Sequence, residues 1–185
     1  PTSSQQNFNR KLKKLAEKYK RKDKNITTML NSVMCSEPVA SMMTMLPKDH
    51  KDGPTMKFRP LVGAVDTPAT GLCQLLCDIL KPVLQKLKGP LNSTQQFVDV
   101  LKEVQLEPGD VFGSLDVINL YGSIPLTGEG NCFEVVTSCF WKFKQLTAFE
   151  KITKTDFKIL LHLALESDIV NIGGLPFRQN DGIAM

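Results

Sequence analysis

Residues 42–46 read Met-Met-Thr-Met-Leu, and residues 57–64 read Lys-Phe-Arg-Pro-Leu-Val-Gly-Ala. Both runs are mainly apolar and have the length of a strand. Residues 48–55 between them are polar and contain an Asp-Gly-Pro turn signal. The pattern predicts two antiparallel strands that form a hairpin with a basic loop.

Two further parts of the chain are predicted to form strands. Gly173-Gly174 separates residues 169–172 from residues 175–179 and is a favourable two-residue turn for a second hairpin. Residues 111–117, Val-Phe-Gly-Ser-Leu-Asp-Val, are predicted to form an apolar strand that carries the carboxylate of Asp116 near its end.

Helices are predicted for much of the remaining chain. Apolar residues recur at helical spacing in residues 5–20, which predicts an amphipathic helix with a basic face. Other predicted helices cover residues 25–35, 130–143 and 155–166. The sum is a helix-rich α+β fold with few strands.

Two predicted helices have clear boundary signals. One begins at Thr67-Pro68, where Thr is a good cap and Pro suits the first helical position. Pro82 is predicted to interrupt this helix and Gly89-Pro90 to end it. The next helix is predicted to be capped by Ser93 and closed by Pro108-Gly109.

The composition places the chain among globular proteins. It has 185 residues, of which 42% are hydrophobic and 23% are charged. These values suit one domain or one lobe of a larger protein and argue against a disordered, collagen-like or disulfide-rich chain. No apolar stretch reaches about 18 residues, so no transmembrane helix is expected. Because the sequence begins at Pro1 and stops at Met185, we expect it to be a piece of a longer protein.

Positive charge is concentrated at the start of the chain. Residues 1–24 contain nine Lys and Arg residues against Glu17 and Asp23, a net charge of +7, whereas the whole chain carries +4. A basic segment on a mildly acidic body suggests contact with a polyanion, and the alternative is a solvated helix face. The residues predicted to contact nucleic acid are Arg10, Lys11, Lys14, Lys18 and Arg21.

The cysteines favour a reduced, intracellular protein without structural zinc. There are five of them, an odd number, with no Cys-x-x-Cys pair, and the chain has two histidines. Cys73 and Cys77 are four residues apart, so we expect them to pack into the core from one helix face.

The most informative segment for function is residues 113–126, Gly-Ser-Leu-Asp-Val-Ile-Asn-Leu-Tyr-Gly-Ser-Ile-Pro-Leu. By itself, an Asp at the end of an apolar strand can be a turn residue or a helix cap. Here Tyr121 follows Asp116 by five positions, and Ser-Ile-Pro-Leu comes after a single glycine. The segment resembles motif A of reverse transcriptases, whose retroviral form reads L-D-V-x-x-x-Y-F-S-V-P-L.

A second match lies upstream, in Leu-Pro-Lys-Asp-His-Lys-Asp-Gly at residues 46–53 and Lys-Phe-Arg-Pro-Leu-Val at residues 57–62. It resembles the fingers hairpin of the same enzymes, in which a Lys and an Arg bind the triphosphate of the incoming nucleotide. Arg59 matches the Arg of that hairpin. Lys48 belongs to the Pro-Lys pair and Lys51 matches better by spacing, so the choice of Lys stays open.

A third match is residues 177–185, Phe-Arg-Gln-Asn-Asp-Gly-Ile-Ala-Met. They are similar to the start of motif B in reverse transcriptases of Penelope-like retroelements, where R-Q-x-D-G-[VI]-A-M continues into G-S-P-L. Ile-Leu-Lys-Pro at residues 79–82 also looks like that family. The three ordered motifs extend over residues 46–185.

The resemblance implies part of a right-hand reverse transcriptase, with helix-rich fingers, a small antiparallel fingers hairpin and an incomplete palm. It divides the chain into a basic N-terminal helical segment at residues 1–40, fingers at residues 41–109 and a partial palm at residues 110–185. The implied activity is RNA-directed DNA polymerisation by two-metal nucleotidyl transfer.

The resemblance also implies roles for particular residues. Asp116 is the catalytic ligand of Mg²⁺, with the neighbouring Val117 as a further ligand, and Tyr121 selects deoxyribose. Gln179 and Met185 belong to the wall beneath the nascent base pair. The implied partners are an RNA template, a DNA primer and deoxynucleoside triphosphates, in an intracellular, nuclear setting and without a membrane.

These residues contain no motif C, the acidic turn that supplies the other catalytic Asp residues of the family. We therefore expect the 185 residues by themselves not to polymerise DNA, although the parent protein would be an enzyme. Strand edges left open in a partial palm predict a homodimer. The alternative is a degenerate or domesticated, non-catalytic module that binds nucleic acid or protein, and the sequence downstream of Met185 would distinguish the two.

Overall fold

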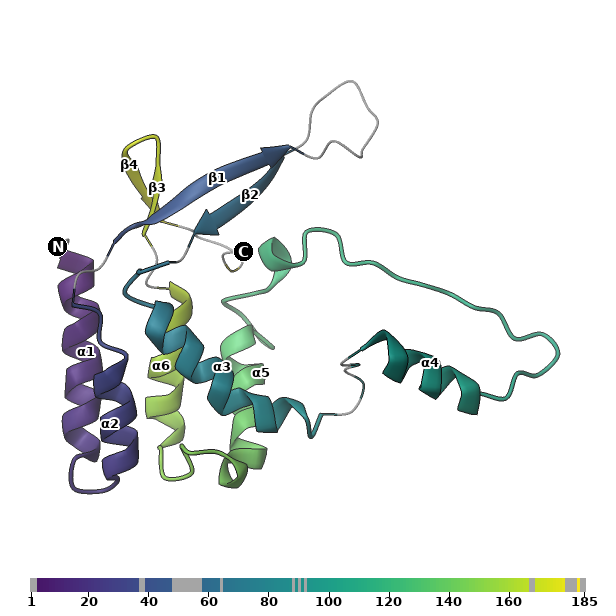
Figure 1. Ribbon diagram of the computed structural model, residues 1–185, viewed down its shortest axis with the longest axis horizontal. Coiled ribbons are helices and arrows are strands. Elements are labelled where there is room, and N and C mark those ends of the chain that lie inside the picture. The colour runs from purple at the N-terminus through teal and green to yellow at the C-terminus, as the bar shows by residue number, and fades with distance from the viewer. Residues whose placement is uncertain are drawn as a thin grey trace.

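The structure is a computed structural model and combines a group of helices with a small sheet at one end (Figure 1). It describes residues 3–36, 39–47, 58–63, 65–87, 89, 91, 93–166, 169–178 and 183. Both helices and strands contribute, so the α+β class expected from the sequence is confirmed at this coarse level.

The first two helices form an antiparallel pair along one side of the molecule (Figure 1). They are α1, Ser3–Tyr19, and α2, Lys24–Ser32, which confirms the first two predicted helices. Asp23 caps α2, because its Oδ1 accepts hydrogen bonds from the N–H groups of Asn25 at 2.9 Å and Ile26 at 3.2 Å.

The third helix, α3, is Thr70–Leu84 and differs from its prediction at both ends. Thr67 does not cap it. Its N–H donates to Thr70 Oγ1 at 3.0 Å and its carbonyl accepts from the Thr70 N–H at 3.2 Å, so the residues before the helix form a separate turn. Pro82 lies inside the last turn of α3 rather than interrupting it, and the helix ends before Gly89.

Two further helices complete the group. They are α5, Cys132–Phe143, and α6, Lys154–Glu166, and both confirm their predictions. The short 3-10 helix η2, Lys144–Leu146, follows α5. The rings of Phe140 and Phe157 stack at a centroid distance of 3.7 Å and join α5 to α6.

The core lies between these helices and draws on all three segments expected from the sequence. Its buried apolar side chains include Phe8, Leu12, Tyr19, Leu30, Leu72, Leu76, Ile79, Phe133, Phe140, Ile152, Phe157 and Leu160. The division into residues 1–40, 41–109 and 110–185 stays a prediction.

The sheet contains four described strands in the order β2-β1-β3-β4. They are β1, Ser41–Pro47, β2, Phe58–Gly63, β3, Ile169–Ile172, and β4, Leu175–Arg178. Both predicted hairpins are confirmed as antiparallel pairs, with Pro60 opposite Met45 in the first and Pro176 opposite Asn171 in the second. The sequence did not predict that β1 and β3 pair in parallel and join the two hairpins.

A long segment, residues 93–120, projects away from the helices, and we call it the arm (Figure 1). It begins with α4, Thr94–Glu103, whose cap Ser93 accepts a hydrogen bond from the Gln96 N–H at 3.1 Å, as predicted. The helix ends at Glu103, before Pro108-Gly109. No side chain of α4 is buried.

The predicted strand at residues 111–117 is wrong. These residues have neither helix nor strand structure and are exposed, with Val111 at 91%. A strand needs a hydrogen-bonding partner for its backbone, and no described strand lies beside this stretch. The apolar pattern alone was therefore not enough to predict a strand here.

The prediction that Cys73 and Cys77 both pack in the core is half right. Cys73 is half-buried and its thiol donates to the carbonyl of Ala164 at 3.6 Å, whereas Cys77 is exposed. Four helical residues advance the direction of a side chain by about 40°, which carries Cys77 beyond the buried face of α3. None of the five cysteines forms a disulfide. None of the described helices is long and apolar enough to cross a membrane.

Replacing Phe157 by Ala should test how much the helical core contributes to stability. The ring is fully buried and stacked, so we expect Phe157→Ala to lower the free energy of unfolding by about 3–5 kcal/mol. The control is Val135→Ala on the exposed side of α5, which should change it by less than about 0.5 kcal/mol. Urea denaturation measures both, and equal losses would contradict this assignment of the core.

Candidate functional site

The segment that resembles motif A contains the 3-10 helix η1, Tyr121–Ser123. The turn before it is tight: Asn119 has a left-handed φ of 52°, and the Ser123 N–H donates to its carbonyl at 3.0 Å. A Cβ at Gly122 would collide with the Asn119 side chain, so glycine fits this position.

One long-range hydrogen bond connects this turn to the end of the chain. The N–H of Ile183 donates to the carbonyl of Tyr121 at 2.9 Å. Ile183 belongs to the segment that resembles motif B, and Tyr121 to the one that resembles motif A. The fold therefore places Ile183 beside Tyr121, although 62 positions separate the two residues in sequence.

Asp116 and Val117 belong to the returning part of the arm, a few residues before it ends at Leu120. Both are exposed to solvent, as expected for Asp116, but the expected strand end is not there because residues 111–117 form no strand. Within the described ranges, no three His, Cys, Asp or Glu side chains come together as a metal-binding group.

Arg59 is in β2, opposite Leu46 of β1, and is exposed. Arg59 therefore lies on the second strand of the hairpin that the sequence predicted. Among the described contacts, none joins Arg59 to Asp116 or Tyr121. The remaining predicted nucleotide-binding residues, Lys48, Lys51, Gln179 and Met185, lie outside the described residues.

The basic face of α1 is built as the sequence predicted. Phe8, Leu12 and Tyr19 are buried on one side of the helix, so the cationic side chains are directed to solvent. Arg10, Lys11, Lys14, Lys18 and Arg21 are all exposed. Arg10 donates a hydrogen bond to Asn7 at 3.1 Å.

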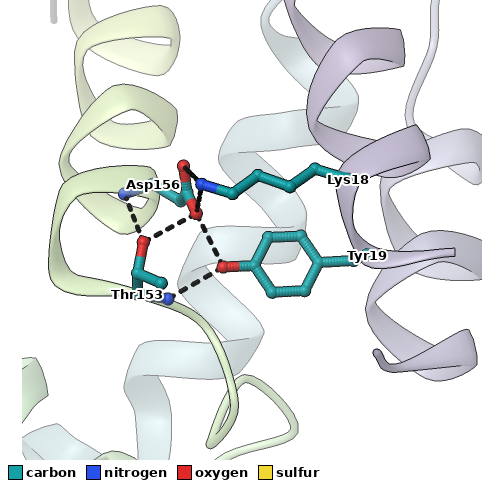
Figure 2. Close-up of polar contacts among 4 residues, drawn as sticks. All are labelled: Lys18, Tyr19, Thr153 and Asp156. Carbon is teal, nitrogen blue, oxygen red and sulfur yellow. Dashed lines mark hydrogen bonds and ion pairs between the residues drawn. The ribbon is translucent and has the colours of Figure 1, made fainter. Parts of the chain in front are cut away.

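Lys18 differs from the other cations of this face because it binds a carboxylate of the same chain. Its Nζ contacts both oxygens of Asp156, at 2.8 and 2.6 Å, and its side chain stays 45% exposed (Figure 2). Asp156, in the first turn of α6, is only 3% exposed. The ammonium therefore reaches from the surface to a buried acid.

Two more side chains donate hydrogen bonds to this carboxylate. Tyr19 donates its hydroxyl hydrogen to Asp156 Oδ2 at 2.7 Å and accepts from the Thr153 N–H at 2.9 Å (Figure 2). Thr153 Oγ1 donates to Oδ2 at 2.6 Å and accepts from the Asp156 N–H at 3.2 Å. We call Lys18, Tyr19, Thr153 and Asp156 the carboxylate network.

The network shifts the acidity of its members. Burial alone raises the pKa of Asp156, but the hydrogen bonds from Lys18, Thr153 and Tyr19 and the charge of Lys18 outweigh it, so the pKa lies below its usual value. The hydrogen bond to Asp156 raises the pKa of Lys18. Burial, followed by the hydrogen bond to Asp156, raises the pKa of Tyr19.

Sequence reasoning missed the carboxylate network. One local signal was present, because Thr153 precedes Asp156 by three positions at the start of a predicted helix, and this spacing is typical of a capping box. The contacts to Lys18 and Tyr19 have no sequence signature, since they bridge more than 130 residues.

Comparison with known proteins gives no relative for this chain: no protein-family model, curated protein or solved structure matches it.

We predict a pH-dependent effect of Asp156→Asn on stability. A carboxyl group whose pKa is lowered by folding stabilises the fold above its unfolded pKa, 3.8, and loses that contribution as the pH falls through the lower folded value. The deficit of Asp156→Asn relative to the wild type should therefore be largest near neutral pH and should shrink below about pH 4.

Urea denaturation at several pH values measures this deficit. Glu134→Gln is the control, because Glu134 is an exposed partner of Lys158, and we expect a change below about 0.5 kcal/mol at every pH. A deficit for Asp156→Asn that stays the same from neutral to acidic pH would show that the charge of Asp156 contributes nothing.

Proposed function

We propose that this chain is part of a reverse transcriptase of the Penelope-like type, comprising the fingers and an incomplete palm. The observation that carries the proposal is the hydrogen bond from Ile183 to Tyr121. The resemblance assigns Tyr121 to the selection of deoxyribose and the segment of Ile183 to the wall beneath the nascent base pair, so both would belong to one nucleotide site. The hydrogen bond joins one residue of each of these two segments, which were identified independently from sequence.

The fingers hairpin gives further support. Its two strands pair antiparallel, and Arg59 is on the second strand with its side chain exposed. A guanidinium at such a position can bind triphosphate oxygens with two parallel hydrogen bonds. The parallel pairing of β1 with β3 places this hairpin in the same sheet as the strands that lead to Ile183.

The proposed metal ligands are oxygen atoms, the type of ligand that Mg²⁺ prefers. Mg²⁺ is usually held by one or two carboxylates together with substrate phosphates and water. Asp116 offers a carboxylate and Val117 a backbone carbonyl, both on exposed residues that a hydrated ion can reach. When bound, the metal would stabilise the charge that develops during nucleotidyl transfer. Tyr121, five positions after Asp116, would select deoxyribose.

A second candidate function is a non-catalytic module that binds protein or nucleic acid. One observation favours it: the arm exposes a run of large apolar side chains, among them Phe112, Leu115 and Ile118, of which Leu115 is entirely exposed. Exposed apolar groups on this scale are typical of a surface that meets another macromolecule.

Triphosphate binding tests the reverse transcriptase proposal. We expect a fluorescent deoxynucleoside triphosphate with Mg²⁺ to bind the chain, and Arg59→Ala to weaken the affinity about tenfold or more, because charge-assisted hydrogen bonds contribute roughly 1.5–3 kcal/mol. Fluorescence anisotropy gives the dissociation constants. The control is Arg21→Ala, which removes the same charge from the turn after α1 and should leave the affinity nearly unchanged. Equal effects of the two variants would indicate non-specific attraction and count against the assigned site.

Salt dependence tests whether the basic face of α1 binds a phosphate backbone. Each neutralised phosphate contributes about 0.7–0.9 to the slope of log affinity against log salt. We expect Lys14→Met to reduce that slope by nearly one phosphate equivalent for an RNA–DNA duplex. Lys18→Met should reduce it less and should lower stability instead, because Lys18 is held by Asp156. A slope that neither variant changes would leave α1 as a solvated face.

A further inference from the structure

The arm carries an amphipathic helix whose apolar face is uncovered. Phe97, Val98, Leu101 and Val104 recur at helical spacing and are between 39% and 49% exposed. Among the described elements, α4 has no extensive contact with another helix or strand, and it stands clear of the body (Figure 1). A helix with one apolar face gains stability by burying it against a partner.

Large apolar side chains are also exposed on the body, at the end of α3 and on α5 and η2. α3 and η2 are in contact. We call Leu84, Leu87, Trp141 and Leu146 the docking patch, and they are between 37% and 50% exposed. The ammonium of Lys144 lies 4.2 Å from the centroid of the Trp141 ring and adds positive charge at the edge of the patch.

The arm and the docking patch have opposite charges. Residues 93–110 contain the acids Asp99, Glu103, Glu107 and Asp110 and a single cation, Lys102. Residues 81–87 and 141–146 contain four lysines, Lys81, Lys86, Lys142 and Lys144, of which Lys81 is paired with Asp78 at 2.7 Å. An acidic helix with an apolar face therefore has a basic counterpart with an apolar centre in the same chain.

The chain leaves α3 without turning back on the docking patch. The N–H groups of Lys86 and Leu87 donate to the carbonyls of Val83 at 3.0 Å and Leu84 at 3.1 Å, so helical-type turns continue beyond α3. α4 then lies farther out from the body (Figure 1). Because the arm points away from the body, it can dock on a second molecule without a change in its conformation.

We propose that two copies of this chain exchange their arms, with the apolar face of α4 of each copy seated on the docking patch of the other. Each copy carries both surfaces, so one two-fold axis satisfies both contacts and the assembly closes as a dimer. The acidic residues of the arm then face the lysines around the patch. This dimer is independent of the proposed polymerase function.

Sedimentation velocity of the full chain, from low to high micromolar concentration, tests the exchange. We expect the wild type to form a dimer and Leu101→Asp to weaken it at least tenfold. The matched control is Gln95→Asp, which adds the same charge on the opposite, polar face of α4 and should leave the dimer intact. Circular dichroism should show folded protein for both, because α4 contributes no buried residue.

A mixing experiment tests the reciprocal arrangement. Leu146→Asp should weaken the dimer as Leu101→Asp does, and Lys144→Glu serves as a second patch variant if Leu146→Asp fails to fold. Mixing the arm variant with the patch variant should restore a dimer, because one of the two contacts is intact in that pair. The proposal is overturned by a wild type that stays monomeric, by patch variants that dimerise normally, or by equal effects of Gln95→Asp and Leu101→Asp.

Discussion

The buried carboxylate of Asp156 links the N-terminal helix to the C-terminal half of the chain. Removing a carboxylate from water is costly unless its oxygens are well hydrogen-bonded, and here Lys18, Tyr19 and Thr153 all donate to it. The contact fixes α1 against the first turn of α6. β1 follows α1 and α2 in the chain, and β3 follows α6. The contact between α1 and α6 therefore also holds together the two parts of the chain from which the parallel strands β1 and β3 extend.

The parts of the fold with local causes could be predicted from the sequence. Ser93 caps its helix, and Gly173-Gly174 forms the turn of the second hairpin, because each signal acts within a few residues. Long-range features could not be predicted: β1 pairs with β3 through Ser41 and Val170, which most of the chain separates, and no local signal specifies that pairing. The strand prediction for residues 111–117 was wrong because a local apolar pattern can indicate a strand but cannot show whether a partner strand lies beside it.

The proposed site also has parts that the sequence could predict and parts that it could not. Tyr121 was identified through the resemblance to motif A, whereas its contact with Ile183 is visible only in three dimensions. Charge alone grouped Lys18 with its neighbours on α1, because a sequence does not show which cation has an acid within reach. The structure separates them, and the basic face then consists of cations that are free to meet an external anion, with Lys18 engaged inside the chain.

Both outer strands of the sheet carry a proline, Pro60 in β2 and Pro176 in β4. Proline lacks an N–H and is tolerated in a strand where that position faces away from the ladder. Each open edge is therefore missing a donor in the middle of its short strand. A foreign strand that tried to extend the sheet would lose a backbone hydrogen bond there, which protects an apolar, methionine-rich hairpin from growing into an aggregate.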